Sequence, residues 1–200
     1  MKKYPIEIKS LWATPIWSSR IESVNNEDLI RFVLDEQARA PEIVVKSNRG
    51  GWQSRKNLFE DIELSGLYEE IWNVCNELWP HINGIQFKQM WAAINKINNW
   101  NRIHNHGANQ ISGGYYLRVP EDSGRIVFQD PVTLRNNRFV NRFVIGGEMQ
   151  WYQPKEHDFI MWPSYLDHFV EPSKSDEDRI MISFDLDIDK SVEKANAPYL

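Results

Sequence analysis

Three histidines and one arginine are the residues of this chain whose types and spacing best fit metal chemistry. His104 and His106 stand at positions i and i+2, so an extended strand would place both imidazoles on one face. His168 comes much later, and a third imidazole from a distant strand would complete a three-ligand site with open positions. Such a site suits a ferrous ion that must also hold a co-substrate and oxygen. Arg179, eleven positions after His168, has a planar guanidinium that would bind a carboxylate in a bidentate manner.

Four motifs in a fixed order surround these residues. They are His104 to His106, Ser112 to Pro120, Pro163 to Pro172, and Arg179 to Phe184. Together they resemble the iron(II)- and 2-oxoglutarate-dependent oxygenases, in particular a bacterial and phage branch with an H-x-H...H...R pattern. The patch from Ser47 to Ser54 is similar to the same branch, so the resemblance extends from the N-terminal strand to Asp185. Several ordered motifs carry more weight than any one of them.

The resemblance implies a fold, a metal centre and a reaction. The fold would be a double-stranded β-helix, which is a cupin-like jelly roll. His104, His106 and His168 would be the catalytic metal ligands. The cofactors would be Fe(II), 2-oxoglutarate and O2, and a 2-oxoglutarate-dependent dioxygenase would hydroxylate its substrate with release of succinate and CO2. These oxygenases more often have an acid where His106 stands, so the iron would lack a protein anion and would rely on the carboxylates of 2-oxoglutarate.

The resemblance also implies where the co-substrate binds. Arg179 would hold the distal carboxylate of 2-oxoglutarate, and Tyr116 would contact the same carboxylate. Ser183 would add a hydroxyl, and Asn95 would hydrogen-bond the other end. Each residue also has a plainer role open to it: Arg179 could pair with the acids at positions 176–178, Tyr116 could fill the core, and Asn95 could be a polar strand-edge residue. A buried arginine at the start of an apolar strand needs a partner, which favours the binding role.

The histidines have alternative roles that stay open. An isolated H-x-H pair can be two ordinary polar residues or part of a zinc site. The pair also opens a cupin metal motif, although Gln110 stands where a cupin would have a glutamate. Asp130 is a rival carboxylate ligand, but its place before Pro131 fits the end of a strand. The alternatives are therefore a cupin-like metal enzyme that does not use 2-oxoglutarate and a non-catalytic metal- or ligand-binding jelly-roll module.

Two segments fit the substrate side of such a site. Residues 131–143 contain Arg135, Arg138 and Arg142, which could grip an anionic small molecule or an acidic peptide, although a solvated loop is the plainer alternative. The patch from Ser47 to Ser54 holds a pair of glycines and could be a lid, a pocket wall or a turn. The sequence does not identify the substrate.

The periodicity of the chain predicts the elements that must position these residues. Apolar residues recur at three- and four-residue steps over 26–38, where Asn25 or Asn26 can cap, and over 63–79, which predicts two helices. Strands are predicted at 85–96, 100–106, 112–119, 124–129, 144–152, 158–162, 167–171 and 178–187. Alternation groups Trp100, Arg102, His104 and His106 on one strand face, and Arg179, Met181, Ser183 and Asp185 on another. Two helices followed by these strands predict an α+β protein with the helices packed on one face of the jelly roll.

Composition and charge bound the class of protein. Two hundred residues at 42% hydrophobic predict one domain, with a strand and helices over 1–83, a jelly-roll core over 84–189 and a tail over 190–200. The net charge of -5 argues against nucleic-acid binding, and the single Cys75 excludes a disulfide framework. No apolar run approaches the ~20 residues of a membrane span, so a cytoplasmic protein is expected, and homodimer formation stays open. Four tryptophans are expected to fill the core: Trp91, Trp100, Trp151 and Trp162.

Overall fold

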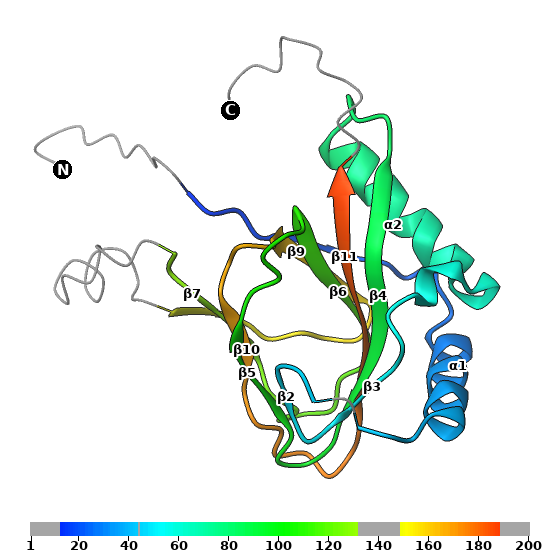
Figure 1. Ribbon diagram of the computed structural model, residues 1–200, viewed down its shortest axis with the longest axis vertical. Helices are drawn as coiled ribbons and strands as arrows, with labels where there is room; N and C mark the ends of the chain where they lie inside the picture. Colours follow the sequence, from blue (N-terminus) through cyan, green and yellow to red (C-terminus); the bar gives the residue numbers. More distant parts are fainter. Residues whose placement is uncertain (1–12, 44, 132–148, 189–200) are drawn as a thin grey trace, which may run out of the picture.

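Two antiparallel β-sheets face each other, and two helices cover the outer face of the larger sheet (Figure 1). The computed structural model describes residues 13–43, 45–131 and 149–188. The six-stranded sheet has the order β1-β9-β6-β11-β4-β3, and the five-stranded sheet has the order β2-β5-β10-β7-β8. The strands are β1 (Trp17–Arg20), β2 (Asn48–Arg49), β3 (Trp52–Gln53), β4 (Ile85–Asn95), β5 (Trp100–His104), β6 (Ile111–Arg118), β7 (Ile126–Gln129), β8 (Met149–Tyr152), β9 (Asp158–Pro163), β10 (His168–Val170) and β11 (Arg179–Ile188). The helices are α1 (Asn26–Arg39) and α2 (Ser65–Leu78), and two short 3-10 turns, Leu58–Glu60 and Ile62–Leu64, precede α2.

The predicted helices and strands are present in the described residues, with ends that shift by one or two positions. Asn25 is the cap of α1, because its side-chain oxygen accepts hydrogen bonds from the amides of Glu27 and Asp28 at 3.1 and 3.4 Å. The strand predicted over 144–152 is described only from Met149 onward. β1 is the described strand of the N-terminal segment for which a strand was expected, whereas the two-residue strands β2 and β3 were not predicted.

Alternation along β11 separates two apolar clusters. Ile182 packs with Leu29 of α1 in the cluster beneath the helices. Met181 packs instead with Phe128 of β7 and Trp162 of β9, in a smaller cluster between the two sheets. The large sheet is therefore covered on both faces, by helices on one and by the small sheet on the other. The odd-numbered residues of β11 face the space between the sheets, as predicted.

A bulge in β5 changes which residues face that space. His168 of β10 pairs with His104, but Val170 pairs with Asn101, so β5 contains one residue more than its partner. Asn101 and His104 therefore both line the interior, whereas Trp100 and Arg102 are exposed. The prediction that Trp100 and Arg102 share a face with His104 is wrong, because simple alternation assumes an unbroken strand.

The patch from Ser47 to Ser54 joins the two sheets. Its first strand, β2, pairs with β5 of the small sheet, and its second, β3, pairs with β4 of the large sheet. Gly51 has φ +70, and a Cβ there would lie only 2.7 Å from the side-chain oxygen of Asn95. A glycine is required because the turn must reverse the chain and also approach Asn95 closely. Ser47 and Gln53 line cavities, so the patch is both a turn and a pocket wall.

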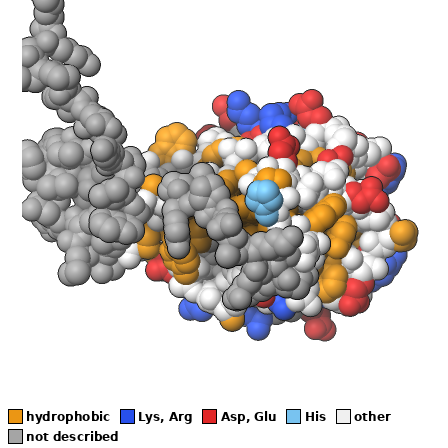
Figure 2. Space-filling model, turned by 90° about the horizontal axis from the view of Figure 1, so that it is seen from above, with side chains coloured by type: hydrophobic (Ala, Val, Ile, Leu, Met, Phe, Trp, Pro, Cys, Tyr) orange, Lys and Arg blue, Asp and Glu red, His pale blue; other side chains and the backbone are white. Residues whose placement is uncertain are grey.

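The described surface carries acidic, basic and apolar side chains in a mixed pattern on the face seen in Figure 2. Trp151 is 59% exposed, so the expectation that it fills the core is wrong, as it is for Trp100; Trp91 and Trp162 are buried as expected. Neither α1 nor α2 is long and apolar enough to cross a membrane. This face of the surface points to no particular partner, and chemistry has to be sought in the space between the sheets.

Candidate metal centre

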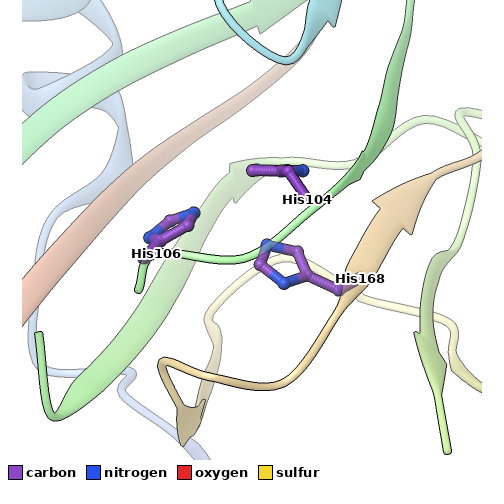
Figure 3. A group of neighbouring side chains, drawn as sticks. All are labelled: His104, His106 and His168. Carbon is purple, nitrogen blue, oxygen red and sulfur yellow. The ribbon is translucent and has the colours of Figure 1, made fainter. Parts of the chain in front are cut away.

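The imidazoles of His104, His106 and His168 meet between the two sheets, and Figure 3 shows the three rings gathered around one point. Each offers a ring nitrogen, and these three atoms lie within 4.8 Å of one another. His104 and His168 are opposite each other in the register of β5 and β10, with ring centroids 4.4 Å apart. His106 follows the end of β5, where its amide donates a hydrogen bond to the carbonyl of Ser164 at 2.9 Å. Among the described residues, this is the one group of histidine, cysteine and acidic side chains with metal-ligand spacing.

Hydrogen bonds to the backbone fix the orientation of two of these rings. Nδ1 of His104 lies 2.8 Å from the carbonyl oxygen of Arg102, and Nδ1 of His168 lies 3.0 Å from that of Leu166. Because a carbonyl oxygen can only accept, both Nδ1 atoms carry the hydrogen. The Nε2 atom of each ring therefore keeps a free lone pair, which is the form that binds a divalent metal.

The third ring is held by a carboxylate. Nδ1 of His106 lies 2.5 Å from Oδ1 of Asp185, and the same oxygen accepts a hydrogen bond from the Ser112 hydroxyl at 2.7 Å. Ser112 also lies 2.7 Å from the hydroxyl of Ser164. Asp185 is buried, so its charge is matched by these contacts and not by water. His106 is thus also left with Nε2 as its free ring nitrogen.

Burial keeps two of the imidazoles neutral. Burial, followed by the nearby His104, lowers the pKa of His168 to about 3. Burial also lowers the pKa of His104. A neutral imidazole is the ligand form of histidine. At neutral pH these two rings are therefore ready to bind a divalent ion without first losing a proton.

The three histidines share one cavity, hereafter the inner cavity, with all four residues predicted to bind the co-substrate. These are Asn95, Tyr116, Arg179 and Ser183. Arg179 opens β11, and Ser183 lies four positions further along the strand, or about 13 Å away. The Cα of Asn95 pairs with that of Arg179 across β4 and β11, so Asn95 lies beside the arginine. The structure therefore brings together residues that are widely separated in the sequence, in a space lined elsewhere mostly by apolar side chains.

Arg179 is the most informative residue of the inner cavity. It is only 2% exposed, and no carboxylate of the described residues forms an ion pair with it. Its Nη1 donates to the carbonyls of Gly124 and Ser123 at 3.1 and 3.4 Å, whereas its Nε has no partner. Trp162, which lines the same cavity, also has a buried ring N–H without a partner. Buried donors without acceptors are rare, and an anion in this cavity would satisfy both the charge and the donors.

A second and larger cavity of about 190 Å³, hereafter the outer chamber, adjoins the inner cavity at His104 and His106. It shares His104, His106, Trp91 and Ser47 with the inner cavity, and it adds a polar lining of Lys46, Gln53, Lys56, Gln89, Asn105, Asn109 and Asp185. Lys56 hydrogen-bonds Gln89, and its ammonium lies 5.4 Å from the Trp91 ring centroid. Sequence reasoning missed these residues, because the lysines flank β2 and β3 and their spacing matches no motif.

The arginines predicted to face the substrate, Arg135, Arg138 and Arg142, lie outside the described residues. Of the arginines that the structure describes, only Arg179 lines either cavity. Arg125 forms a two-point ion pair with Glu171, with N–O distances of 2.6 and 2.5 Å. The guanidinium of Arg125 is therefore already paired with a carboxylate outside both cavities.

Asp185 was placed on the cavity face of β11 by alternation, but the sequence assigned it no role. Two signals were present: an acid within an apolar strand, and a position six residues beyond Arg179 on the same face. The rival carboxylate Asp130 and the cupin-like candidate Gln110 are not part of the histidine group. Gln110 instead accepts a hydrogen bond from the amide of Ile188 at 3.1 Å.

Comparison with known proteins agrees with this geometry. Residues 89–185, which run from β4 to β11 and contain the three histidines and the four residues predicted to bind the co-substrate, match a family model described as "Putative 2OG-Fe(II) oxygenase". No curated protein matches the sequence.

Similar solved structures cover most of the chain at low sequence identity. A viral collagen prolyl hydroxylase from Paramecium Bursaria Chlorella virus-1, solved with 2-oxoglutarate, is 13% identical, with a TM-score of 0.60 over 86% of this chain and 94% of that one. A prolyl-4-hydroxylase from Pseudomonas putida is 12% identical, with a TM-score of 0.59 over 87% and 92%. HygX from Streptomyces hygroscopicus, solved with nickel, 2-oxoglutarate and hygromycin B, is 10% identical, with a TM-score of 0.60 over 87% and 83%.

These likenesses define the fold as the double-stranded β-helix of the 2-oxoglutarate oxygenases, and the predicted fold class is confirmed. The family match over residues 89–185 and the histidine group together support the resemblance to the 2OG-Fe(II) oxygenases that the sequence indicated. It is an oxidoreductase that uses Fe(II), 2-oxoglutarate and O2.

Proposed function

We propose that His104, His106 and His168 hold Fe(II) through their Nε2 atoms and that Arg179 holds the distal carboxylate of 2-oxoglutarate. The observation that carries this assignment is the buried guanidinium of Arg179, which pairs with no anion among the described residues and shares a cavity with the three histidines. A dicarboxylate fits that cavity because one carboxylate can meet the arginine while the other end reaches the metal. When bound, iron and co-substrate would supply the oxygen chemistry: one atom of O2 would enter the succinate that forms with CO2 from 2-oxoglutarate, and the other would enter a C–H bond of the substrate.

The remaining residues of the inner cavity orient the co-substrate and exclude water. Tyr116 is buried, and burial raises its pKa to about 12, so at neutral pH its hydroxyl is a neutral donor for a carboxylate. Asn95 pairs with Arg179 in the strand register, which favours the end held by the arginine over the other end that the sequence suggested, and Ser183 lines the same cavity. Apolar residues such as Met181 close the rest of the cavity, which strengthens each of these polar contacts.

The outer chamber is the proposed site of the substrate, since His104 and His106 line it whereas Arg179 does not. Its polar lining fits a small molecule or a peptide side chain with several hydrogen-bonding groups. Lys46 and Lys56 both line it, and neither forms an ion pair with a described carboxylate, which supports an anionic substrate. Arg135, Arg138 and Arg142 are proposed to add to this positive charge. The cytoplasm, where ferrous iron and 2-oxoglutarate are available, is the proposed place of action.

An anaerobic titration tests the assignment. Fe(II) protein should develop a metal-to-ligand absorption band when 2-oxoglutarate is added, and exposure to O2 should then release succinate. His104→Ala should show neither signal. Metal binding without a 2-oxoglutarate-dependent band would instead favour a cupin-like enzyme that does not use this co-substrate, and a band without succinate would favour a binding module.

Charge on the substrate side needs a separate test. Replacing Lys46 and Lys56 together by glutamine should leave the slow succinate release without substrate unchanged, because neither residue touches the inner cavity. The same change should abolish the extra rate that an anionic substrate produces. Lys96→Gln is a matched control, since Lys96 faces Asp178 at 3.9 Å on the surface. Equal stimulation of succinate release in the double variant and in wild type would show that the two lysines do not bind the substrate.

A further inference from the structure

Three neutral imidazoles bring no negative charge to a divalent metal. A ferrous site with open positions generally has two histidines and one carboxylate, and the carboxylate offsets part of the charge of the ion. Among the described residues, no carboxylate joins His104, His106 and His168 in the metal-ligand group. The acid in contact with the group is Asp185, which touches one of the rings.

Asp185 is held in one position by short contacts. Its side chain is 3% exposed, and Oδ1 lies 2.5 Å from Nδ1 of His106. Ser112 donates to the same oxygen at 2.7 Å, and Ser164 lies 2.7 Å from the Ser112 hydroxyl. His106 is the one basic side chain of the described residues that pairs with Asp185. A buried carboxylate whose two donors are neutral would be stabilised further by a partner that carries part of a positive charge.

The three rings differ in the group that their Nδ1 atoms contact. The Nδ1 atoms of His104 and His168 meet neutral carbonyls, whereas that of His106 meets an anion. A carboxylate on the far nitrogen of a metal-bound imidazole fixes the tautomer and makes the ring a stronger donor to the metal. Only His106 receives this support.

We propose that Asp185 is the anion of this metal centre and acts through His106 instead of binding the metal directly. It is a positioning residue: it keeps the hydrogen on Nδ1 of His106, aims Nε2 at the metal and supplies the negative charge that three imidazoles lack. The proposal rests on the function proposed above, since it assumes that the histidines bind a metal. The acid that the three-histidine ligand set lacks would then be Asp185 of β11, which is separated from the metal position by the imidazole of His106.

Asp185→Asn is the direct test, because asparagine keeps the shape and can still accept from Nδ1 of His106 while it removes the charge. Anaerobic titration with Fe(II), and with Co(II) as a spectroscopic probe, should give a metal affinity about 10- to 100-fold weaker than wild type. Asp187→Asn is the matched control on the same strand, since Asp187 accepts from the Gln110 amide away from the histidines. The melting temperature of the metal-free proteins should be measured in parallel.

The outcomes separate this proposal from the general function. If wild type itself binds no metal, the proposed function fails. If wild type and Asp185→Asn bind metal with equal affinity, the function stands and Asp185 is only a structural residue. A lower melting temperature with unchanged metal affinity leads to the same conclusion.

Relocation of the charge gives a second test. An aspartate at position 106 would reach about as far as Nδ1 of the present ring and would meet Asp185, so two carboxylates would repel each other beside the metal. The His106→Asp/Asp185→Asn double variant should therefore bind Co(II) at least tenfold more tightly than His106→Asp alone. A single variant that binds as tightly as the double variant would overturn the proposal.

A measurement on wild type does not depend on how the variants fold. In the zinc-loaded protein, nitrogen NMR of His106 should show the metal on Nε2 and a strongly hydrogen-bonded proton on Nδ1. Metal on Nδ1, or a ring with no such proton, would contradict the role given to Asp185.

Discussion

Replacement of Arg179 by lysine should weaken 2-oxoglutarate binding far more than it weakens the fold. An ammonium keeps the charge but cannot reproduce the planar two-point contact of a guanidinium with a carboxylate. Loss of a hydrogen bond to a charged group costs roughly 1.5–3 kcal/mol, which corresponds to about 10- to 100-fold in affinity.

The same change can be read as a thermal shift of the metal-loaded protein. At a 2-oxoglutarate concentration of 100 times the wild-type Kd, binding should stabilise the wild-type protein by about 2.7 kcal/mol, or about 5–10 °C for a chain of this size. At that concentration the lysine variant would be only 1- to 10-fold above its own Kd, so the gain should fall to about 0.4–1.4 kcal/mol, or about 1–6 °C.

A second variant, Arg179→Met, separates an effect on 2-oxoglutarate binding from an effect on stability, because the stability of the metal-free protein can be measured separately. In the part of the chain that the structure describes, no carboxylate pairs with the buried guanidinium, so methionine relieves an uncompensated charge and loses only the bonds to two carbonyls. The variant should be about as stable as wild type without ligand, yet gain nothing from 2-oxoglutarate. Arg125→Lys is the control, because Arg125 is paired with Glu171 away from the cavity and its change should leave 2-oxoglutarate binding intact. Strong destabilisation of Arg179→Met together with unchanged 2-oxoglutarate binding would show that the arginine is structural and would refute the assignment.

Three further predictions concern the histidines and the neighbouring tyrosines. His106→Ala should abolish Fe(II) binding in an anaerobic titration, because two imidazoles hold a labile ion poorly; wild-type affinity in this variant would exclude His106 as a ligand. Tyr116→Phe should weaken 2-oxoglutarate binding about 3- to 10-fold in the same titration, for the loss of one hydrogen bond worth about 1 kcal/mol, whereas Tyr115→Phe should change only stability. The two residues point to opposite faces, and the Tyr115 hydroxyl donates to the carbonyl of Ile21 at 2.9 Å, among the residues beneath the helices. The metal-free protein should lose stability as the pH falls from about 6.5 toward 3, because the folded pKa of His168, about 3, lies below its unfolded value, so protons favour the unfolded chain. The full loss is on the order of 5 kcal/mol, and His168→Gln should flatten the pH profile of urea unfolding; an unchanged profile would mean that His168 contributes nothing to it.

Much of the architecture could be predicted because apolar spacing reports local structure directly. The helix periods, the Asn25 cap and the strand runs are properties of neighbouring residues, and they appear where expected. The bulge in β5 could not be predicted, because the extra residue is defined only by the pairing with β10. The exposure of Trp100 follows from that bulge, since the insertion of one residue reverses the faces of all residues before it.

Site residues could be predicted where they belong to motifs with a recognisable order along the chain. They could not be predicted where their role depends on contacts between distant positions. The histidines and Arg179 stand in such an order, whereas the contact between His106 and Asp185 spans 79 positions of sequence. Lys46 and Lys56 reach the outer chamber only because β2 and β3 join the two sheets. Contacts of this kind arise from strand register, which no local pattern encodes.

The strand β11 has a consequence for how this protein can change. Arg179, Ser183 and Asp185 occupy alternate positions of one strand that is hydrogen-bonded on both sides, to β4 and to β6. Deletion or insertion of a single residue between Arg179 and Ser183 would turn one end of the set toward the helices, so co-substrate and metal contacts could not both persist. Substitutions can alter these functions one at a time, but changes in length cannot. Variation in chain length among functional descendants of this sequence should therefore be confined to the connections and excluded from β11.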